Sequence, residues 1–268
     1  MKAILRSGFL ALAIMAFAVP ANAGPLEDGL AAYDRGNYAT ALRHWQPLAE
    51  QGHVGAQNNL GIMYYNGEGV RQDYTEAVKW YRKAAERGDA GARNNLGLMY
   101  RDGAGVPQDY GEAVKWWRLA AEQGLAQAQF SLGLMYHKGR GVLHDYAKAV
   151  QWYRPAAEQN LANAQFLLGF MYNSGRGVPQ DYSRAVKWLR LAAGQGYAFA
   201  QTTLGNMYRD GRGVPQDFAM AHMWYNLAAA SDDEYGPKNR DRLAKLMTPD
   251  QIAEAQRMAR EWMAKHQR

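Results

Sequence analysis

Six histidines are the side chains of this 268-residue sequence best suited to acid–base catalysis or metal binding. They never occur as His-Glu-x-x-His or as another closely spaced ligand pair, so only folding could gather them into a metal site. The sequence also has no Gly-x-Ser-x-Gly nucleophile motif and no cysteine, which excludes a thiolate nucleophile and a disulfide. We therefore predict a non-enzymatic protein without catalytic, cofactor-binding or metal-binding residues. The histidines are His44, His53, His137, His144, His222 and His266.

Two repeated patterns could also bind small ligands. The Gly-x-Gly loops, such as Gly103 to Gly105, resemble a phosphate cradle, but an aspartate after each loop would cap the next helix and repel an anion. A tryptophan recurs from Trp80 to Trp224 at one spacing and could form an aromatic ladder for sugars or bases. We favour packing between repeats for these tryptophans, and packing against the C-terminal end of the molecule for His222.

These patterns belong to a repeat with a period of 36 residues. Such a period is typical of helical solenoids, in which each unit buries its apolar face against its neighbours. Function is therefore expected on a surface that stacking creates. A leucine followed by glycine marks the units at Leu60, Leu96, Leu132, Leu168 and Leu204.

Each unit is predicted to contain two helices. In one unit Ala92, Leu96 and Met99 lie three and four residues apart and so share one helix face. Asp109, followed three residues later by Glu112, predicts a capping box at the start of the second helix.

Small residues mark two other features of each unit. Glycines such as Gly124 stand where the second helix must end, and Asn160 replaces them once, as expected for a residue in the left-handed conformation. The glycine after each leucine lies inside a helix, where it costs about 1 kcal/mol relative to alanine. We expect it to allow close packing against the alanine pair of the second helix, for example Ala120-Ala121.

The first 23 residues have the features of a cleaved signal peptide. Lys2 and Arg6 precede an apolar run of about 12 residues, which is shorter than the roughly 20 that a membrane-spanning helix needs. Ala21-Asn22-Ala23 supplies a cleavage site, so we predict a periplasmic or secreted protein without a transmembrane anchor. Removing the two basic residues lowers the formal charge from +6 to +4, a mild surplus that does not indicate a nucleic-acid partner.

The repeat closely resembles the Sel-1-like repeat family, a branch of the tetratricopeptide superfamily. The shared text is Leu-Gly-x-Met-Tyr-x-x-Gly-x-Gly-Val-x-x-Asp-Tyr-x-x-Ala-x-x-Trp-x-x-x-Ala-Ala, which departs from this pattern at Phe218 in the last copy. The resemblance implies an all-α fold, a right-handed superhelical solenoid of antiparallel helix pairs that serves as a scaffold for protein partners. It also implies a link to envelope assembly or to cell-wall or polysaccharide machinery.

The sequence thus divides into four segments. Residues 1–23 are the signal peptide, and residues 24–59 form a degenerate N-terminal capping repeat and the start of the array. Residues 60–230 carry the repeat array, and residues 231–268 form C-terminal capping helices.

In the superfamily a second face of each first helix lines the concave groove, and we expect the partner to bind there. Its centre is apolar and aromatic and its ends carry amides and arginines, unless neighbouring repeats already cover the phenylalanines. The groove residues are Asn58, Ile62 and Tyr65, then Asn94, Leu98 and Arg101, then Phe130, Leu134 and His137, then Phe166, Phe170 and Asn173, and finally Thr202, Asn206 and Arg209.

We predict a non-catalytic scaffold of the cell envelope that binds an extended peptide or a helix in this groove. Phenylalanines would supply affinity, Asn58, Asn94 and Asn206 would bind the ligand backbone, and Arg101 and Arg209 would select acidic side chains. The alternatives are a peptidoglycan- or polysaccharide-associated module and an envelope hydrolase such as a β-lactam-acting enzyme.

Overall fold

The computed structural model describes residues 24–230 and 234–266, and these ranges form helices without any strand. The predicted signal peptide lies outside the described residues. The helices are α1 (Pro25–Asp34), α2 (Tyr38–Glu50), α3 (Val54–Asn66), α4 (Tyr74–Glu86), α5 (Ala90–Asp102), α6 (Tyr110–Glu122), α7 (Ala126–Lys138), α8 (Tyr146–Glu158), α9 (Ala162–Ser174), α10 (Tyr182–Gly194), α11 (Ala198–Asp210), α12 (Phe218–Ala229), α13 (Tyr235–Ala244) and α14 (Pro249–His266).

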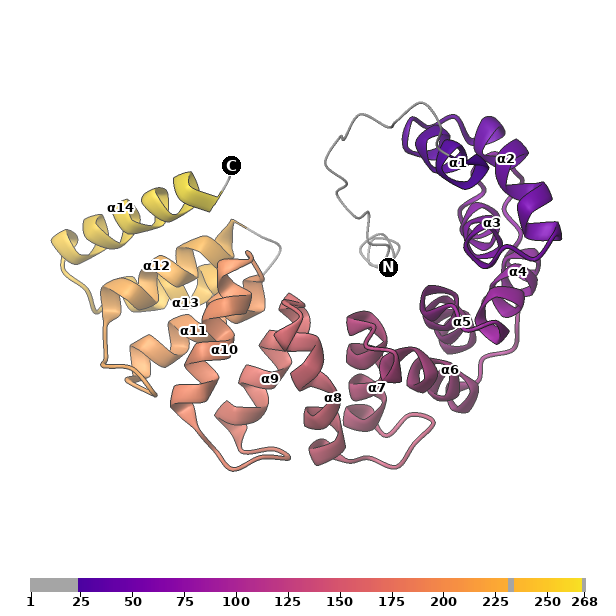
Figure 1. The fold of residues 1–268 in the computed structure, drawn as a ribbon. Helices are drawn as coiled ribbons and strands as arrows, with labels where there is room; N and C mark the ends of the chain where they lie inside the picture. Colours follow the sequence, from indigo (N-terminus) through magenta and orange to yellow (C-terminus); the bar gives the residue numbers. More distant parts are fainter. Residues whose placement is uncertain (1–23, 231–233, 267–268) are drawn as a thin grey trace.

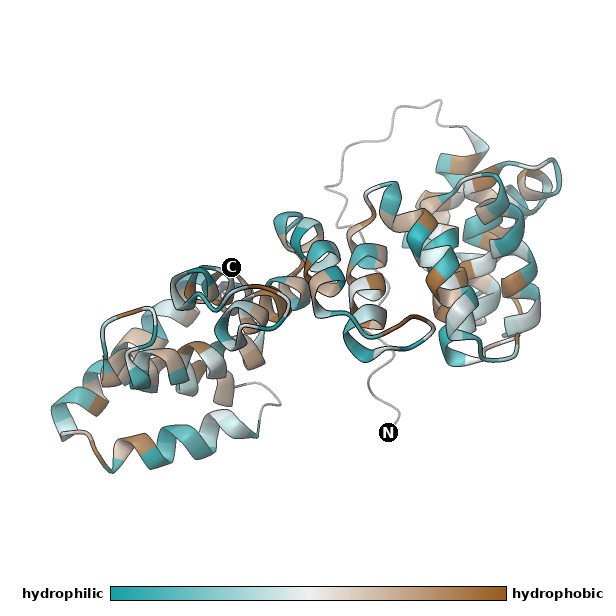
Figure 2. Cartoon of the chain, turned by 90° about the horizontal axis from the view of Figure 1, so that it is seen from below, coloured by the Kyte–Doolittle hydropathy of each residue, from teal (hydrophilic) through white to brown (hydrophobic). Residues whose placement is uncertain are grey.

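Consecutive helices pair as hairpins, and the hairpins stack into an arc (Figure 1). In the N-terminal half the odd-numbered helices lie on the inner side of the arc and the even-numbered helices on the outer side. Hydrophobic residues are spread along every helix and are not gathered in one centre (Figure 2). The predicted all-α solenoid is therefore confirmed, and its core is a continuous layer between the hairpins.

The glycine after each leucine allows the two helices of a hairpin to approach closely, as predicted, but the partner differs. A Cβ added at Gly97 would lie 2.4 Å from Nε1 of Trp117, and one at Gly133 would lie 2.7 Å from the Tyr153 ring. The large side chain of the second helix thus packs on the glycine, and the alanine pair does not. The glycine provides the space for one bulky core side chain per hairpin.

The loop between the two helices of each hairpin packs against the preceding hairpin. Gly105 has φ +71° and lies against Tyr74, the first residue of the preceding second helix. A Cβ added at Gly105 would be 2.3 Å from the backbone oxygen of Tyr74. At the other end of the second helices, Asn160 has φ +65°, which confirms that it replaces glycine in the left-handed conformation.

The predicted capping boxes are only half formed in the array. The Asp109 side chain accepts a hydrogen bond from the backbone N–H of Glu112 at 3.0 Å, as expected for an N-cap. Its own N–H donates to the carbonyl of Tyr100, so Glu112 has no donor there and pairs with Lys115. A complete box occurs at α14, where Thr248 and Gln251 exchange both hydrogen bonds.

A glutamine that the sequence analysis missed connects each hairpin to the next. The buried Gln165 side chain donates to the carbonyl of Ala157 at 3.1 Å, near the end of the preceding second helix. In one unit Arg93 takes this place and donates to Ala85. The residues satisfy helix-terminal carbonyls that stacking removes from water. The equivalent glutamines are Gln57, Gln129 and Gln201.

The repeated tryptophans pack between repeats. Trp116 on α6 is half-buried against the apolar cluster built from α4 and α5, and Trp80 packs on the cluster of the first hairpins. The predicted packing role is thus confirmed, and the first four tryptophans expose only part of their rings to solvent.

The last two helices cover the end of the stack. Trp262 on α14 meets Trp224 on α12 edge to face, with ring centroids 6.1 Å apart. His222 on α12 is buried, and the charges of Arg240 and Asp241 on α13 are near enough to affect its pKa, in agreement with the predicted packing role. Among the described residues its Nδ1 has no hydrogen-bond partner.

His222 predicts a pH dependence of stability. Burial, followed by the charge of Arg240, lowers the pKa of His222 below 6.5 despite the opposing effect of Asp241. The unfolded chain therefore binds a proton more readily, and stability present above pH 6.5 is lost as the pH falls through the folded-state pKa. His222→Val, which copies Val186, should lose stability between pH 7.5 and 5.5 less steeply than the wild type, by at most about 1.4 kcal/mol per pH unit. Urea titrations at each pH measure the difference, and parallel curves would contradict it.

Candidate functional site

The predicted groove residues occupy the first helices of the hairpins, and the structure leaves them half-buried, with Thr202 buried. On α11 the face opposite the buried Gln201, Gly205 and Tyr208 carries Phe199, Thr203 and Asn206. The predicted groove residues therefore include Asn206 and its equivalents, which belong to the exposed face of the first helices. The other predicted positions, such as the buried Thr202, lie to one side of that face, toward a neighbouring hairpin. Residues missed on the other flank are Asn59, Asn95, Ser131, Leu167, Phe199 and Thr203.

The contacts of Asn58 show the direction of this rotation. The side-chain amide of Asn95 on α5 donates to Oδ1 of Asn58 on α3 at 3.3 Å. The side chains of Asn58 and Asn95 thus meet between two neighbouring first helices. The repeated Asn-Asn pair at 58–59 and 94–95 was the signal that could have identified both flanks.

Four aromatic rings from α9 and the start of α11 form one cluster. We call Phe166, Phe170, Tyr197 and Phe199 the aromatic patch. The Phe166 ring centroid lies 5.2 Å from that of Tyr197, 6.2 Å from that of Phe199 and 6.5 Å from that of Phe170. Phe199 is 51% exposed, although it is a large apolar side chain. Neighbouring repeats therefore cover the patch only in part.

Phe130 and His137 on α7 lie on a more enclosed part of the wall. The Phe130 ring centroid is 5.9 Å from that of the buried Tyr153, whose hydroxyl lies 3.2 Å from Nδ1 of His137. Burial, together with the nearby His144 and Arg176, lowers the pKa of His137. The imidazole is therefore neutral at pH 7, and these two residues serve α7–α8 packing as much as the groove.

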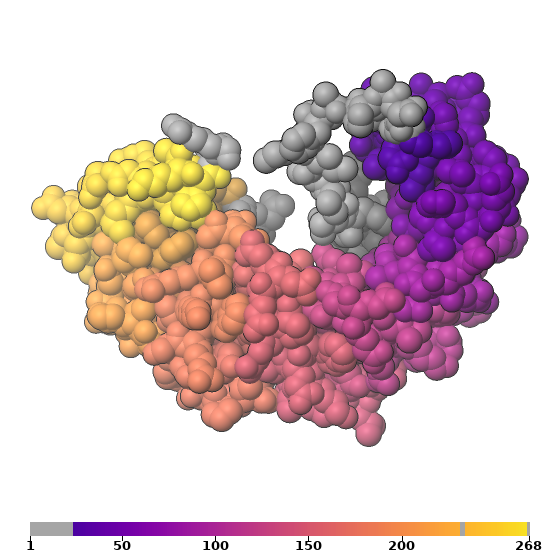
Figure 3. Space-filling model, in the orientation of Figure 1, coloured from indigo at the N-terminus to yellow at the C-terminus, as the bar shows by residue number. Residues whose placement is uncertain are grey.

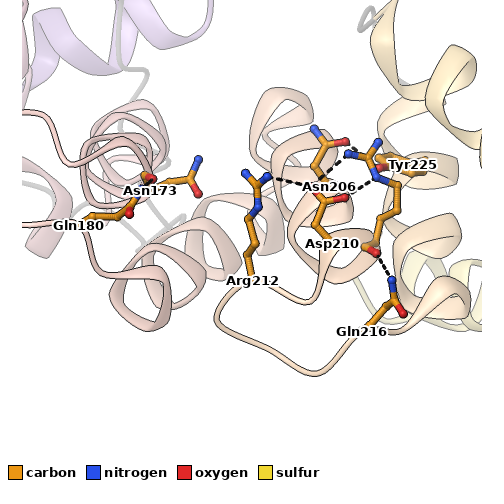
Figure 4. Close-up of polar contacts among 8 residues, drawn as sticks. Asn173, Gln180, Asn206, Asp210, Arg212, Gln216 and Tyr225 are labelled. Carbon is orange, nitrogen blue, oxygen red and sulfur yellow. Dashed lines mark hydrogen bonds and ion pairs between the residues drawn. The ribbon is translucent and has the colours of Figure 1, made fainter.

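A polar cavity of about 270 Å³ lies toward the C-terminal ends of α9 and α11, whereas the aromatic patch lies toward their N-terminal ends. It is lined by Asn173, Thr203, Asn206, Met207, Arg209, Asp210 and Arg212. The Asp210 carboxylate pairs with both arginines, and Figure 4 shows its contact with Arg212. Asn173, Asn206 and Arg209 come from the predicted set, so the structure brings these three together.

The arginines in this wall are already paired. Arg209 donates through Nε and a terminal nitrogen to the Asp210 carboxylate at 2.7 and 3.2 Å, and Arg101 contacts Asp102 in the same way at 2.6 and 2.7 Å. The prediction that both arginines select acidic partner side chains is therefore not supported, because neighbouring carboxylates occupy their bidentate faces.

Asn206 is fixed by a hydrogen bond from the second helix of its hairpin. The Tyr225 hydroxyl donates to Oδ1 of Asn206 at 2.7 Å, and burial raises the pKa of Tyr225 to about 12. The hydroxyl therefore stays protonated, and it directs the amide N–H₂ of Asn206 away from Tyr225 as a hydrogen-bond donor. The cavity thus presents amide and hydroxyl groups beside apolar rings, a combination suited to a peptide.

Two further properties concern other kinds of site. In the part of the chain that the structure describes, no three His, Asp or Glu side chains gather where a metal ion could bind. None of the described helices is both long and apolar enough to cross a bilayer.

Comparisons with known proteins identify the repeat. A family model described as Sel1 repeat matches residues 22–53, 54–89, 90–125, 126–161, 162–197 and 198–233. No curated protein matches the chain. Among solved structures, a Sel1 repeat protein from Oxalobacter formigenes is 34% identical, with 91% of this chain and 96% of that chain covered and a TM-score of 0.78.

A second solved structure is a protective antigen present in uropathogenic Escherichia coli strains, with an SLR fold, 38% identity and a TM-score of 0.79. The match covers 91% of this chain but 52% of that one, so the chain spans about half the length of this relative. The chain belongs to the Sel1 repeat family, whose helical repeats typically act as protein–protein interaction modules.

Proposed function

We propose that this chain is a non-catalytic scaffold of the bacterial cell envelope that binds an extended peptide segment of a partner protein along α9 and α11. The aromatic patch is the observation that carries the proposal. Exposed aromatic rings that touch one another on a concave wall are the type of residue that dominates binding energy in protein interfaces. Phe199 offers the most exposed of these rings.

The remaining wall complements the patch. A bound peptide that covers the patch with an apolar side chain places its backbone beside the cavity of Asn173 and Asn206, whose amides can bind backbone groups. The described residues form an arc that is open on one side (Figure 3). Affinity comes from apolar burial, while the amides fix the register of the peptide.

The envelope location is proposed from the leader sequence, with a mature chain that begins near Gly24. The Escherichia coli relative is a protective antigen, which is consistent with an exported protein.

Loss of the aromatic patch should abolish binding of the partner. Photo-crosslinking from position 203 in the native cell identifies the partner, and its affinity is then measured with purified proteins. Phe170→Ser combined with Phe199→Ser should weaken binding by a factor of 30 or more, about 2 kcal/mol, because it removes two of the four rings.

Leu143→Ser is the matched control, because Leu143 is 91% exposed and lies on a loop outside the groove. It should leave the affinity within twofold of the wild type. An unchanged affinity of the double variant, with an unchanged helical circular dichroism spectrum, would exclude the groove as the binding surface.

A further inference from the structure

The loop of each hairpin fits onto the hairpin before it by one recurring contact. The second glycine of the Gly-x-Gly pair lies on the first residue of the preceding second helix. A Cβ at Gly141 would be 2.3 Å from the backbone oxygen of Tyr110, and one at Gly177 would be 2.4 Å from that of Tyr146. Only a residue without a side chain can approach so closely.

The residue between the two glycines adds a second contact. The Arg140 guanidinium lies 5.5 Å from the ring centroid of Tyr110, and Arg176 lies 5.5 Å from that of Tyr146. Both distances are within the range of cation–π attraction. The start of α6 and the start of α8 thus each receive a Gly-Arg-Gly segment from the loop that follows, whereas the glycine contact alone also recurs at Gly105 and Gly213.

α12 is the second helix that no such loop follows. Its first residue, Phe218, is the equivalent of Tyr146 and Tyr110, but the chain continues into α13 and α14, which have no Gly-x-Gly loop between them. In place of the loop there is a cavity of about 450 Å³ between the start of α12 and one side of α14. It is lined by Gln216, Asp217, Phe218, Ala219, Met220, Gln251, Glu254 and Met258.

The lining suits an arginine better than an acidic or neutral group. The half-buried Phe218 provides an aromatic ring, Met220 and Met258 provide apolar walls, and Asp217 and Glu254 add two exposed carboxylates. Glu254 forms no ion pair among the described residues, so its carboxylate is available to a cation. The volume is within the usual range of ligand pockets.

We propose that this cavity binds a glycine-flanked arginine of a partner protein, in the way that the chain's own loops bind the preceding helices. The site is separate from the groove and needs no occupant there. It lies where the Gly-x-Gly loop of a further repeat would pack, between α12 and α14 near the C-terminal end of the arc (Figure 1).

The chain itself supplies a pair of probes that differ at one residue. Residues 175–181 read Gly-Arg-Gly-Val-Pro-Gln-Asp, and residues 103–109 read Gly-Ala-Gly-Val-Pro-Gln-Asp. Both peptides, blocked at their ends, are titrated into the full-length protein with methyl-labelled methionines. We expect the arginine peptide to shift the Met220 and Met258 methyl signals and to bind three- to tenfold more tightly than the alanine peptide, from cation–π and charge interactions.

Glu254→Gln should reduce this preference at least twofold, because it removes one carboxylate without changing the shape of the cavity. Glu261→Gln, at an exposed position of α14 outside the cavity, is the matched control and should leave the preference unchanged. Absence of shifts at Met220 and Met258 with millimolar peptide, or equal binding of the two peptides, would overturn the proposal. The variant that combines Phe170→Ser with Phe199→Ser should bind the arginine peptide as the wild type does. This result separates the test of the cavity from the test of the proposed function.

Discussion

Gly105→Ala is expected to lower the free energy of unfolding by about 3 kcal/mol or more. The left-handed conformation at φ +71° costs alanine about 1–2 kcal/mol of folding free energy relative to glycine. Its Cβ would also lie 2.3 Å from the backbone oxygen of Tyr74, and a backbone atom cannot move aside as a flexible side chain can. The loop must therefore separate from α4, which weakens the contact between two hairpins.

Gly124→Ala isolates the conformational part of this cost. Gly124 has φ +90°, and an added Cβ there meets no atom within 4 Å. The control should lose only about 1–2 kcal/mol. Urea denaturation followed by circular dichroism measures both variants, and hydrogen exchange of α4 and α5 shows whether the loss is local. Equal losses in the two variants would show that the close contact with Tyr74 adds nothing.

Trp117→Ala is expected to cost about 3–5 kcal/mol, the usual range for a buried tryptophan. The Trp117 side chain is fully buried, fills the space over Gly97, and donates from Nε1 to the carbonyl of Asn94 at 3.2 Å. Trp116→Ala is the neighbouring control, because Trp116 is only half-buried. Its loss should be clearly smaller in the same urea titration.

A double-mutant cycle tests the geometry of this contact. Gly97→Ala alone forces its Cβ to within 2.4 Å of the Trp117 indole and should cost about 1–3 kcal/mol. In the Trp117→Ala background that clash is gone, so the same substitution should become neutral or favourable, since alanine is the better helix former. An equal cost in both backgrounds would mean that Trp117 is not what excludes a side chain at position 97.

The period of the sequence was enough to predict the helices and the stacking, because one error in register would bury polar residues in every unit. The direction of the inner wall could not be predicted with the same accuracy. The rotation of one hairpin on the next brings Asn58 and Asn95 into contact between two first helices, and that rotation depends on packing between distant residues.

Local charge pairs were the second source of error. Arg101 and Arg209 each precede an aspartate, and the adjacent carboxylate pairs with the guanidinium. Gln165 was missed for a different reason: a polar residue inside an apolar pattern reads as surface, whereas here it is buried because its donor meets a helix-end carbonyl.

The hairpins of the arc contact their sequence neighbours and little else. In such a stack, a small rotation between two hairpins adds to the rotation between the next two. The ends of the arc can therefore change their separation while each contact between neighbouring hairpins changes little. Deformation spread over many joints costs little at each of them. We therefore expect the curvature of this protein to be set by the sum of many small rotations between neighbouring hairpins.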